Sequence, residues 1–137
     1  MTNGIKILVV DDEPGVRWAL EMILHRSGFA VASVGSGKEA LGWLSHQSCH
    51  VILMDAKLGD IEGVVLAKQI QTTKASTAPV VLVSGYFYKD DSTIQNNLKS
   101  GVISAFVTKP FRHDEILKAI QSVLMTGQHA IPRVPTP

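Results

Sequence analysis

Short apolar runs alternate with amphipathic segments along the chain. The runs cover residues 5–10, 29–34, 51–54, 80–83 and 104–108. Between them, apolar residues recur every three or four positions, as Leu20, Ile23 and Leu24 do, which is the period of a helix with one buried face. This alternation of strand-like and helix-like segments predicts an α/β fold built on a parallel sheet.

Local signals mark the ends of the predicted helices. Pro14 suits the first turn of a helix that Gly28 stops, and residues 36–39 have the Ser-x-x-Glu pattern of a capping box. Two later helices are expected from residue 64 to about residue 72 and over residues 116–124.

The side chains of the predicted helices support two further expectations. Residues 90–101 offer only Ile94 and Leu98 as core anchors. At ~25 cal/mol per Å² of buried apolar area, two anchors hold a helix less firmly than five, so this helix should be the most easily displaced. Trp18 and Trp43 both lie on predicted helices, and we expect partial burial of each.

Chemically reactive side chains occur where four of the apolar runs end. In chain order these ends are Asp11-Asp12-Glu13, Asp55, Ser84-Gly85 and Lys109-Pro110. The carboxyl ends of parallel strands meet at one edge of a sheet, where ligands bind in open α/β folds. Carboxylates held close together repel each other unless a cation joins them. The pattern predicts a hard divalent-cation site beside an acidic nucleophile, with Glu13 interpreted as a solvated acid of the first helical turn.

Composition and charge narrow the function classes. A chain of 137 residues is long enough for one domain with a real core. The formal net charge of +1 gives no electrostatic signature for nucleic acid, so no direct nucleic-acid binding is expected. No apolar run approaches the roughly 20 residues that span a bilayer, and the first residues lack the apolar stretch of a signal peptide, so no membrane role is expected. A single Cys49 fits a reducing cytoplasm.

The four strand-end motifs together resemble those of receiver domains of two-component response regulators, over about residues 5–126. The resemblance implies a flavodoxin-like, doubly wound (βα)5 fold with a five-stranded parallel sheet in the order 2-1-3-4-5. It places a receiver domain at residues 1–126. Residues 127–137, rich in proline, are expected to be a disordered tail or the stump of a linker.

The resemblance also implies that Asp55 accepts a phosphoryl group from a histidine kinase or a phosphotransfer protein. Mg²⁺ or Mn²⁺ would be held by Asp11, Asp12, Asp55 and the backbone carbonyl of Lys57, since such ions prefer oxygen ligands. The remaining roles would fall to Lys109 as a charge partner of the phosphoryl oxygens, and to the Ser84 hydroxyl and the Gly85 amide as hydrogen-bond donors. Such a domain is not an enzyme beyond catalysing its own phosphorylation and dephosphorylation.

In the family, phosphorylation draws the hydroxyl group toward the new phosphoryl group, here from Ser84. An aromatic residue three positions before the lysine, here Phe106, then turns inward. The resemblance therefore implies a change in the face formed by the fourth helix, the fifth strand and the fifth helix. The same face is a possible homodimer contact.

Some positions depart from the family pattern. Gly59 stands where a proline is usual and should make the turn after Asp55 more permissive, whereas Gly63 keeps its family position. Asp60 and Glu62 are interpreted as loop and helix-start residues. Extra residues near Tyr86-Phe87-Tyr88-Lys89 and around Val102-Ile103 suggest an altered partner surface.

Three alternatives remain open at this point. A small Mg²⁺-dependent phosphatase with an aspartate nucleophile would carry two aspartates separated by one residue, whereas Asp11 and Asp12 are adjacent. An FMN carrier would need a Ser/Thr/Gly-rich phosphate loop after the first strand, where this chain has Asp11-Asp12-Glu13. A docking module that is never phosphorylated would not need the complete set of residues.

Overall fold

The computed structural model describes residues 4–85 and 92–126. Within these residues, five parallel strands form one sheet in the order β2-β1-β3-β4-β5. The strands are β1 (Lys6–Val10), β2 (Ala30–Val34), β3 (Val51–Asp55), β4 (Val80–Gly85) and β5 (Ala105–Lys109). The predicted flavodoxin-like fold and strand order are confirmed. The predictions for the segment Tyr86-Phe87-Tyr88 and for the tail at 127–137 lie outside the described residues.

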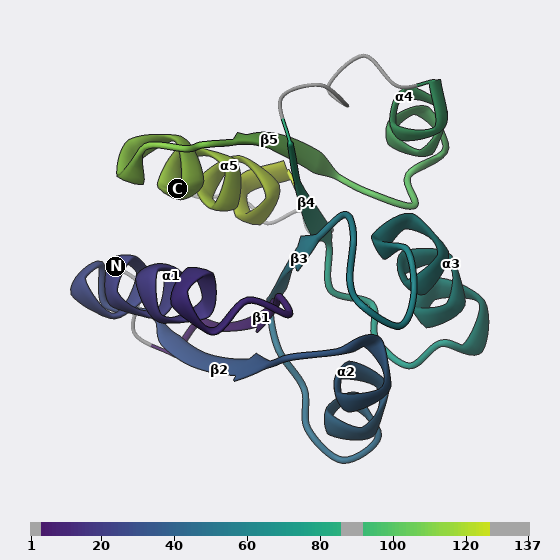
Figure 1. Cartoon of the computed structure of the whole chain (residues 1–137), viewed down its shortest axis with the longest axis horizontal. Helices are drawn as coiled ribbons and strands as arrows, with labels where there is room; N and C mark the ends of the chain where they lie inside the picture. Colours follow the sequence, from purple (N-terminus) through teal and green to yellow (C-terminus); the bar gives the residue numbers. More distant parts are fainter. Residues whose placement is uncertain (1–3, 86–91, 127–137) are drawn as a thin grey trace.

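Helices cover both faces of the sheet. They are α1 (Pro14–Arg26), α2 (Gly37–Leu44), α3 (Gly63–Thr73), α4 (Ser92–Ser100) and α5 (His113–Thr126). Helices α1 and α5 lie on one face, and α2, α3 and α4 lie on the other (Figure 1). Among the described residues, no helix combines the length and the apolarity that crossing a membrane requires.

The core consists of two apolar layers, one on each face of the sheet. Alternate residues of β1 divide between them, because successive side chains of a strand point to opposite faces. Ile7 belongs to the layer under α1 and α5, whereas Leu8 belongs to the layer under α2, α3 and α4. β3 is buried along its whole length, as expected for the central strand of a parallel sheet.

The helix ends largely follow the local sequence signals. Gly28 has φ of +92°, the left-handed conformation that favours glycine after a helix. The Ser36 hydroxyl accepts a hydrogen bond from the Glu39 N–H at 3.0 Å, as the capping box predicts. The Glu39 carboxylate accepts its bond from the N–H of Gly35, at 2.6 Å, so the return bond falls one residue before the position expected for a capping box.

Helix α4 buries a polar residue besides its two apolar core anchors. Ile94 is buried and Leu98 is half-buried, but Asn97 is also buried, with 5% of its surface exposed. The Asn97 side chain donates a hydrogen bond to the Thr93 carbonyl at 2.6 Å, and the Asn97 carbonyl accepts one from the Ile103 N–H. Ile94 and Leu98 are the α4 side chains in the apolar core, as predicted, and Asn97 adds a buried polar residue, which can be buried because it bonds within its own helix.

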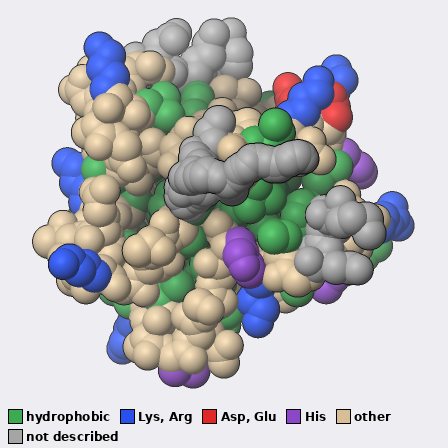
Figure 2. All heavy atoms as spheres, turned by 180° about the vertical axis from the view of Figure 1, so that it is seen from behind, with side chains coloured by type: hydrophobic (Ala, Val, Ile, Leu, Met, Phe, Trp, Pro, Cys, Tyr) green, Lys and Arg blue, Asp and Glu red, His purple; other side chains and the backbone are tan. Residues whose placement is uncertain are grey.

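Basic side chains are scattered over the face seen from behind in Figure 2. Most Lys and Arg side chains lie at its rim, one lies further in beside a His side chain, and at the upper right basic and acidic side chains lie together. Among the side chains drawn there, no basic stripe of the kind that binds nucleic acid is visible.

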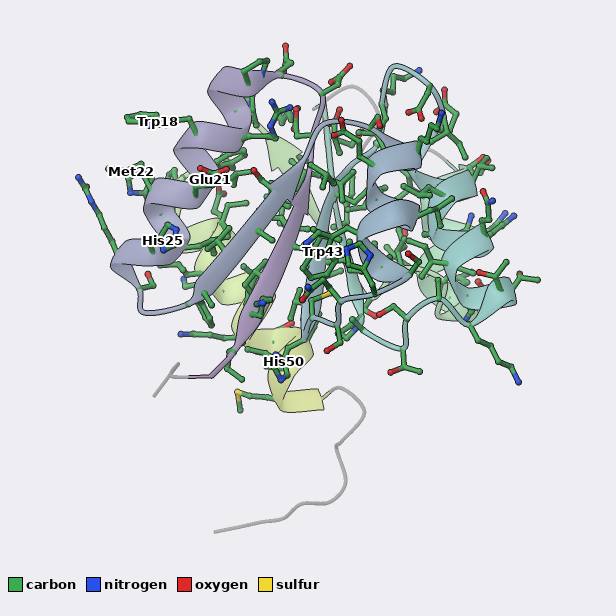
Figure 3. All side chains as sticks on the ribbon, turned by 90° about the horizontal axis from the view of Figure 1, so that it is seen from below. Trp18, Glu21, Met22, His25, Trp43 and His50 are labelled. Carbon is green, nitrogen blue, oxygen red and sulfur yellow. The ribbon has the colours of Figure 1, made fainter. Side chains whose placement is uncertain are left out.

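The two tryptophans differ in burial. Trp43 is half-buried on α2, and the Lys6 ammonium lies 5.8 Å from the centre of its ring. Trp18 on α1 is 64% exposed and projects away from the sheet (Figure 3). The prediction of partial burial was therefore wrong for Trp18, which lies on the side of α1 opposite its buried residues.

Asp60 connects the loop after β3 to the start of α2. Its two carboxylate oxygens accept hydrogen bonds from the N–H groups of Gly37 and Lys38, each at 3.0 Å. The Ile61 side chain lies so close to Gly37 that a Cβ at residue 37 would approach it to 2.4 Å. Asp60 therefore caps α2 from 23 residues away in sequence, a role that its interpretation as a loop residue missed.

We expect the Asp60 cap to make stability depend on pH. The N–H of Gly37, followed by that of Lys38, lowers the pKa of Asp60 below the ordinary 3.8. A lowered pKa in the folded state contributes stability above the unfolded-state pKa, and this contribution is lost as pH falls through the folded-state pKa. Asp60→Asn should therefore lower the urea midpoint at pH 7, and the difference from wild type should shrink as the pH falls below 3.8. Glu62→Gln is the control, because Glu62 makes no side-chain cap bond. A pH-independent difference for Asp60→Asn would contradict the cap.

Candidate functional site

Strand register brings the strand-end residues together at the carboxyl edge of the sheet. Val10 is paired with Met54, so Asp11 and Asp55 follow neighbouring positions on adjacent strands. On the other side of β3, β4 and β5 pair Gly85 with Lys109. The site thus forms from segments far apart in sequence, because β1, β3, β4 and β5 each end at or next to a functional residue at the same edge.

Three carboxylates form a compact cluster. One oxygen each from Asp11, Asp12 and Asp55 lies within 4.8 Å of the others. Asp11 is 1% and Asp55 9% exposed, whereas Asp12 is exposed to solvent. Oxygen ligands at this spacing, two of them shielded from water, suit a hard divalent cation. The donor set is therefore compatible with Mg²⁺.

Lys109 is the cation that meets this cluster in the described structure. Its ammonium lies 3.0 Å from an Asp55 oxygen, 3.4 Å from an Asp11 oxygen and 3.8 Å from a Glu13 oxygen. Burial lowers the pKa of Lys109, but the hydrogen bond and charge of Asp55, together with Asp11, outweigh burial and raise the pKa above its ordinary value. Lys109 therefore stays protonated and holds one positive charge beside several negative ones.

The Asp55 carboxyl is short of positive charge. Burial raises its pKa above the ordinary value, and the charges of Asp11 and Asp12 add to this, while Lys109 acts in the opposite direction. One lysine cannot balance three carboxylates and Glu13. A further cation at this place would be stabilised by the remaining negative charge.

Two residues that sequence reasoning did not assign to the site hold Asp11 in place. The Arg17 guanidinium donates a hydrogen bond to the Asp11 carbonyl at 2.6 Å. The Asp11 side chain accepts one from the Glu13 N–H at 2.9 Å. Glu13 is the N-cap of α1 rather than a residue of its first turn, and its side chain reaches Lys109. The spacing of Arg17 on α1 carries no signal for a backbone contact six residues earlier.

The loop from β3 to α3 is tightly hydrogen-bonded despite Gly59. Lys57 and Glu62 form an antiparallel bridge, and the Gly63 N–H donates to the Ala56 carbonyl at 2.7 Å. Lys57 lines the same depression as Asp55. The expectation of a permissive turn finds no support in these contacts.

Gly63 is required by a close approach of two backbone segments. A Cβ at this position would lie 2.4 Å from the Asp55 carbonyl oxygen and 3.0 Å from the Ala56 Cα. We expect Gly63→Ala to lower the free energy of unfolding by about 1–3 kcal/mol, as overpacking commonly does. Gly42→Ala is the matched control, because its Cβ would meet nothing within 4 Å. That change should be neutral or stabilising in a helix. Equal urea midpoints for Gly63→Ala and wild type would show that the loop can move aside.

The cluster opens into a solvent-accessible depression of about 330 Å³. Its lining comprises Asp12, Glu13, Asp55, Ala56, Lys57, Ser84, Gly85 and Lys109. Ser84 is 2% exposed and is one of these lining residues. Phe106 is half-buried and packs against the core layer that contains Ile94 of α4. The predicted residues thus meet at one place, with Phe106 behind them toward α4.

A family model for the response regulator receiver domain matches residues 7–121. The chain belongs to this family. As a receiver domain, it is a signalling module of two-component systems, and the expected membership is confirmed.

Relatives of known sequence and structure agree with this assignment. The transcriptional regulatory protein TrcR of Mycobacterium tuberculosis is 27% identical over 127 residues, which are 93% of this chain and 48% of TrcR. This receiver domain thus spans about half the length of that relative.

Solved structures share the fold. A CheY-like receiver domain from Methanospirillum hungatei is 25% identical with a TM-score of 0.78, over 88% of this chain and 93% of that one. TrrA of Thermotoga maritima, whose structure is a complex with Mg²⁺-BeF, is 28% identical with a TM-score of 0.74, over 87% of this chain and 98% of that one.

Proposed function

We propose that Asp55 of this receiver domain accepts a phosphoryl group from a phosphohistidine of a histidine kinase or phosphotransfer protein. The observation that carries the proposal is the carboxylate cluster of Asp11, Asp12 and Asp55, with the Lys109 ammonium 3.0 Å from Asp55. An aspartate nucleophile, a cation site and a fixed positive charge are the parts that phosphoryl transfer to a carboxylate needs.

The transfer follows from these positions. An Asp55 carboxylate oxygen forms a bond to phosphorus while the P–N bond of the donor breaks, and the imidazole leaves with the electron pair. The Lys109 ammonium, the Ser84 hydroxyl and the Gly85 N–H would stabilise the phosphoryl oxygens. Asp11, Asp12, Asp55 and the Lys57 carbonyl would hold Mg²⁺ or Mn²⁺, which supplies further positive charge to those oxygens. Attack of water on phosphorus later regenerates the carboxylate.

The signal would leave through α4, β5 and α5. Ser84 lines the site, and Phe106 packs against the layer that contains Ile94 of α4. Movement of the Ser84 hydroxyl toward a phosphoryl group would change the space available to Phe106 and so the position of α4. The face formed by these elements would then bind an output partner or a second copy of the chain.

The cellular setting follows from the same chemistry. We place the protein in the reducing cytoplasm, which its single cysteine, Cys49, fits. Burial raises the pKa of the Cys49 thiol to about 11, so the thiol stays protonated. The formal net charge of +1 supports protein partners over direct nucleic-acid binding by this chain.

Incubation with acetyl phosphate tests the proposal. In Mg²⁺ we expect the intact mass to rise by one phosphoryl group per chain, and in EDTA we expect no adduct. Turnover of assorted phosphomonoesters without an adduct would favour the phosphatase, and a yellow protein as purified would favour an FMN carrier. An unchanged mass in Mg²⁺ would favour a docking module and overturn the proposal.

A further inference from the structure

The outward side of α1 carries an uncharged stripe, which we call the α1 outer stripe. Its members are Pro14, Trp18, Met22 and His25. Residues four and three positions apart lie on one side of a helix. Trp18 is 64% exposed, His25 is exposed and Met22 is half-buried, whereas the buried residues of α1 face the sheet. Figure 3 shows Trp18 and Met22 extending outward from the helix.

Three charged side chains of α1 flank the stripe, and one of them, exposed Arg26, follows His25 at the end of the helix. Arg17 and Glu21 border it on the side toward β2, where the Ser33 hydroxyl donates a hydrogen bond to Glu21 and Arg17 bonds the Asp11 carbonyl. These bonds fix both charged side chains in place along the border. An exposed tryptophan and a methionine with no charge between them are typical of the centre of a protein–protein interface.

We propose that the α1 outer stripe binds the same stripe of a second copy of this chain, with the two helices antiparallel. A two-fold axis passing midway between Trp18 and Met22 sets each Trp18 against the partner's Met22, a favourable sulfur–aromatic contact. The same axis sets His25 against the partner's Pro14. Along the border, the axis brings Glu21 beside the partner's Arg17 and Arg17 beside the partner's Glu21. Both of these rim pairs join opposite charges.

The border charges favour a second copy over an unlike chain. On the border toward β2, Arg17 and Glu21 are complementary to their own antiparallel image, whereas a strongly acidic or basic partner would meet a like charge there. The size of the stripe limits the affinity of the dimer. A helix of 13 residues is about 20 Å long. The area that one side of such a helix can bury is well below the roughly 800 Å² per partner of stable interfaces. The dimer should therefore be weak and reversible.

Sedimentation equilibrium of the unphosphorylated protein tests the proposal over about 10–500 μM, the range of a small interface. We expect the weight-average mass of wild type to rise toward that of a dimer, and Trp18→Ala to remain monomeric throughout. Val65→Ala is the control, because Val65 is a 51% exposed apolar residue on α3. It should associate as wild type does. A monomeric wild type at the highest concentration, or unchanged association of Trp18→Ala, would overturn the proposal.

A charge exchange tests the orientation. Glu21→Arg and Arg17→Glu should each weaken self-association at least about threefold, because each places like charges across the axis. Their equimolar mixture should associate better than either variant alone, since both rim pairs then join opposite charges. A mixture no stronger than its components would exclude the antiparallel pairing. These measurements need no phosphoryl donor, so their outcome is independent of the function proposed for Asp55.

Discussion

Asp55→Asn is expected to abolish uptake of a phosphoryl group from acetyl phosphate while leaving the fold intact. The amide has the shape of the carboxylate but is not a nucleophile toward phosphorus at neutral pH. The change also removes one of three mutually repelling carboxylates, which offsets the loss of the ion pair with Lys109 at 3.0 Å. The raised pKa of Asp55 means that the fold does not favour its charged form, so the free energy of unfolding should change little or rise in this variant.

Intact mass and urea unfolding of the same Asp55→Asn preparation measure the two effects together. Asp114→Asn is the matched control, since Asp114 lies on α5 and pairs with Arg112 at 3.1 Å. It should take up phosphoryl as wild type does. Uptake by Asp55→Asn at the wild-type rate would move the acceptor to another carboxylate, with exposed Asp12 the nearest candidate.

Lys109→Met is expected to slow phosphorylation by about 100-fold, the usual effect of removing one fixed charge from a transition state. The methionine keeps most of the length of the side chain and removes the ammonium that lies within 3.4 Å of both Asp11 and Asp55. Mg²⁺ affinity should rise, because the acidic cluster then lacks its competing cation. Loss of phosphorylation and gain of metal affinity together are not expected from a general loss of structure.

Calorimetric titration with Mg²⁺ and the rate of adduct formation give the two readouts for Lys109→Met. Lys118→Met removes the same charge from an 80% exposed side chain on α5 and should change neither. If the urea midpoint of Lys109→Met collapsed, Lys109 would be primarily a structural residue.

The fold could be predicted from the sequence because its signals are local. Apolar runs of strand length alternate with helical periods, and Pro14 and Gly28 bound α1 as expected. The strands β3 and β4 run one and two residues further than the apolar runs, through Asp55 and Gly85. A polar residue continues a strand where its backbone still pairs with a neighbour, which hydropathy alone does not show.

The gathering of Asp11, Asp12, Asp55 and Lys109 could also be predicted, since each follows an apolar run and parallel strands end at one edge. Contacts between a side chain and a backbone group distant in sequence could not be predicted. Whether Asp60 faces water or the N–H of Gly37 depends on how the loop after β3 folds across α2.

Helical spacing also left one choice open. It placed Trp18 on a helix, but an aromatic residue can lie on either side of an amphipathic helix. Only the packed structure shows it in solvent.

Chemical trapping of the phosphorylated residue tests the central claim most directly. Borohydride reduces an aspartyl phosphate to homoserine, and tandem mass spectrometry of the digested protein then locates the converted residue. After treatment with acetyl phosphate and Mg²⁺, we predict homoserine at position 55 and nowhere else. Homoserine at position 11 or 12, or an unconverted residue 55 in protein that carries the phosphoryl group, would contradict the account.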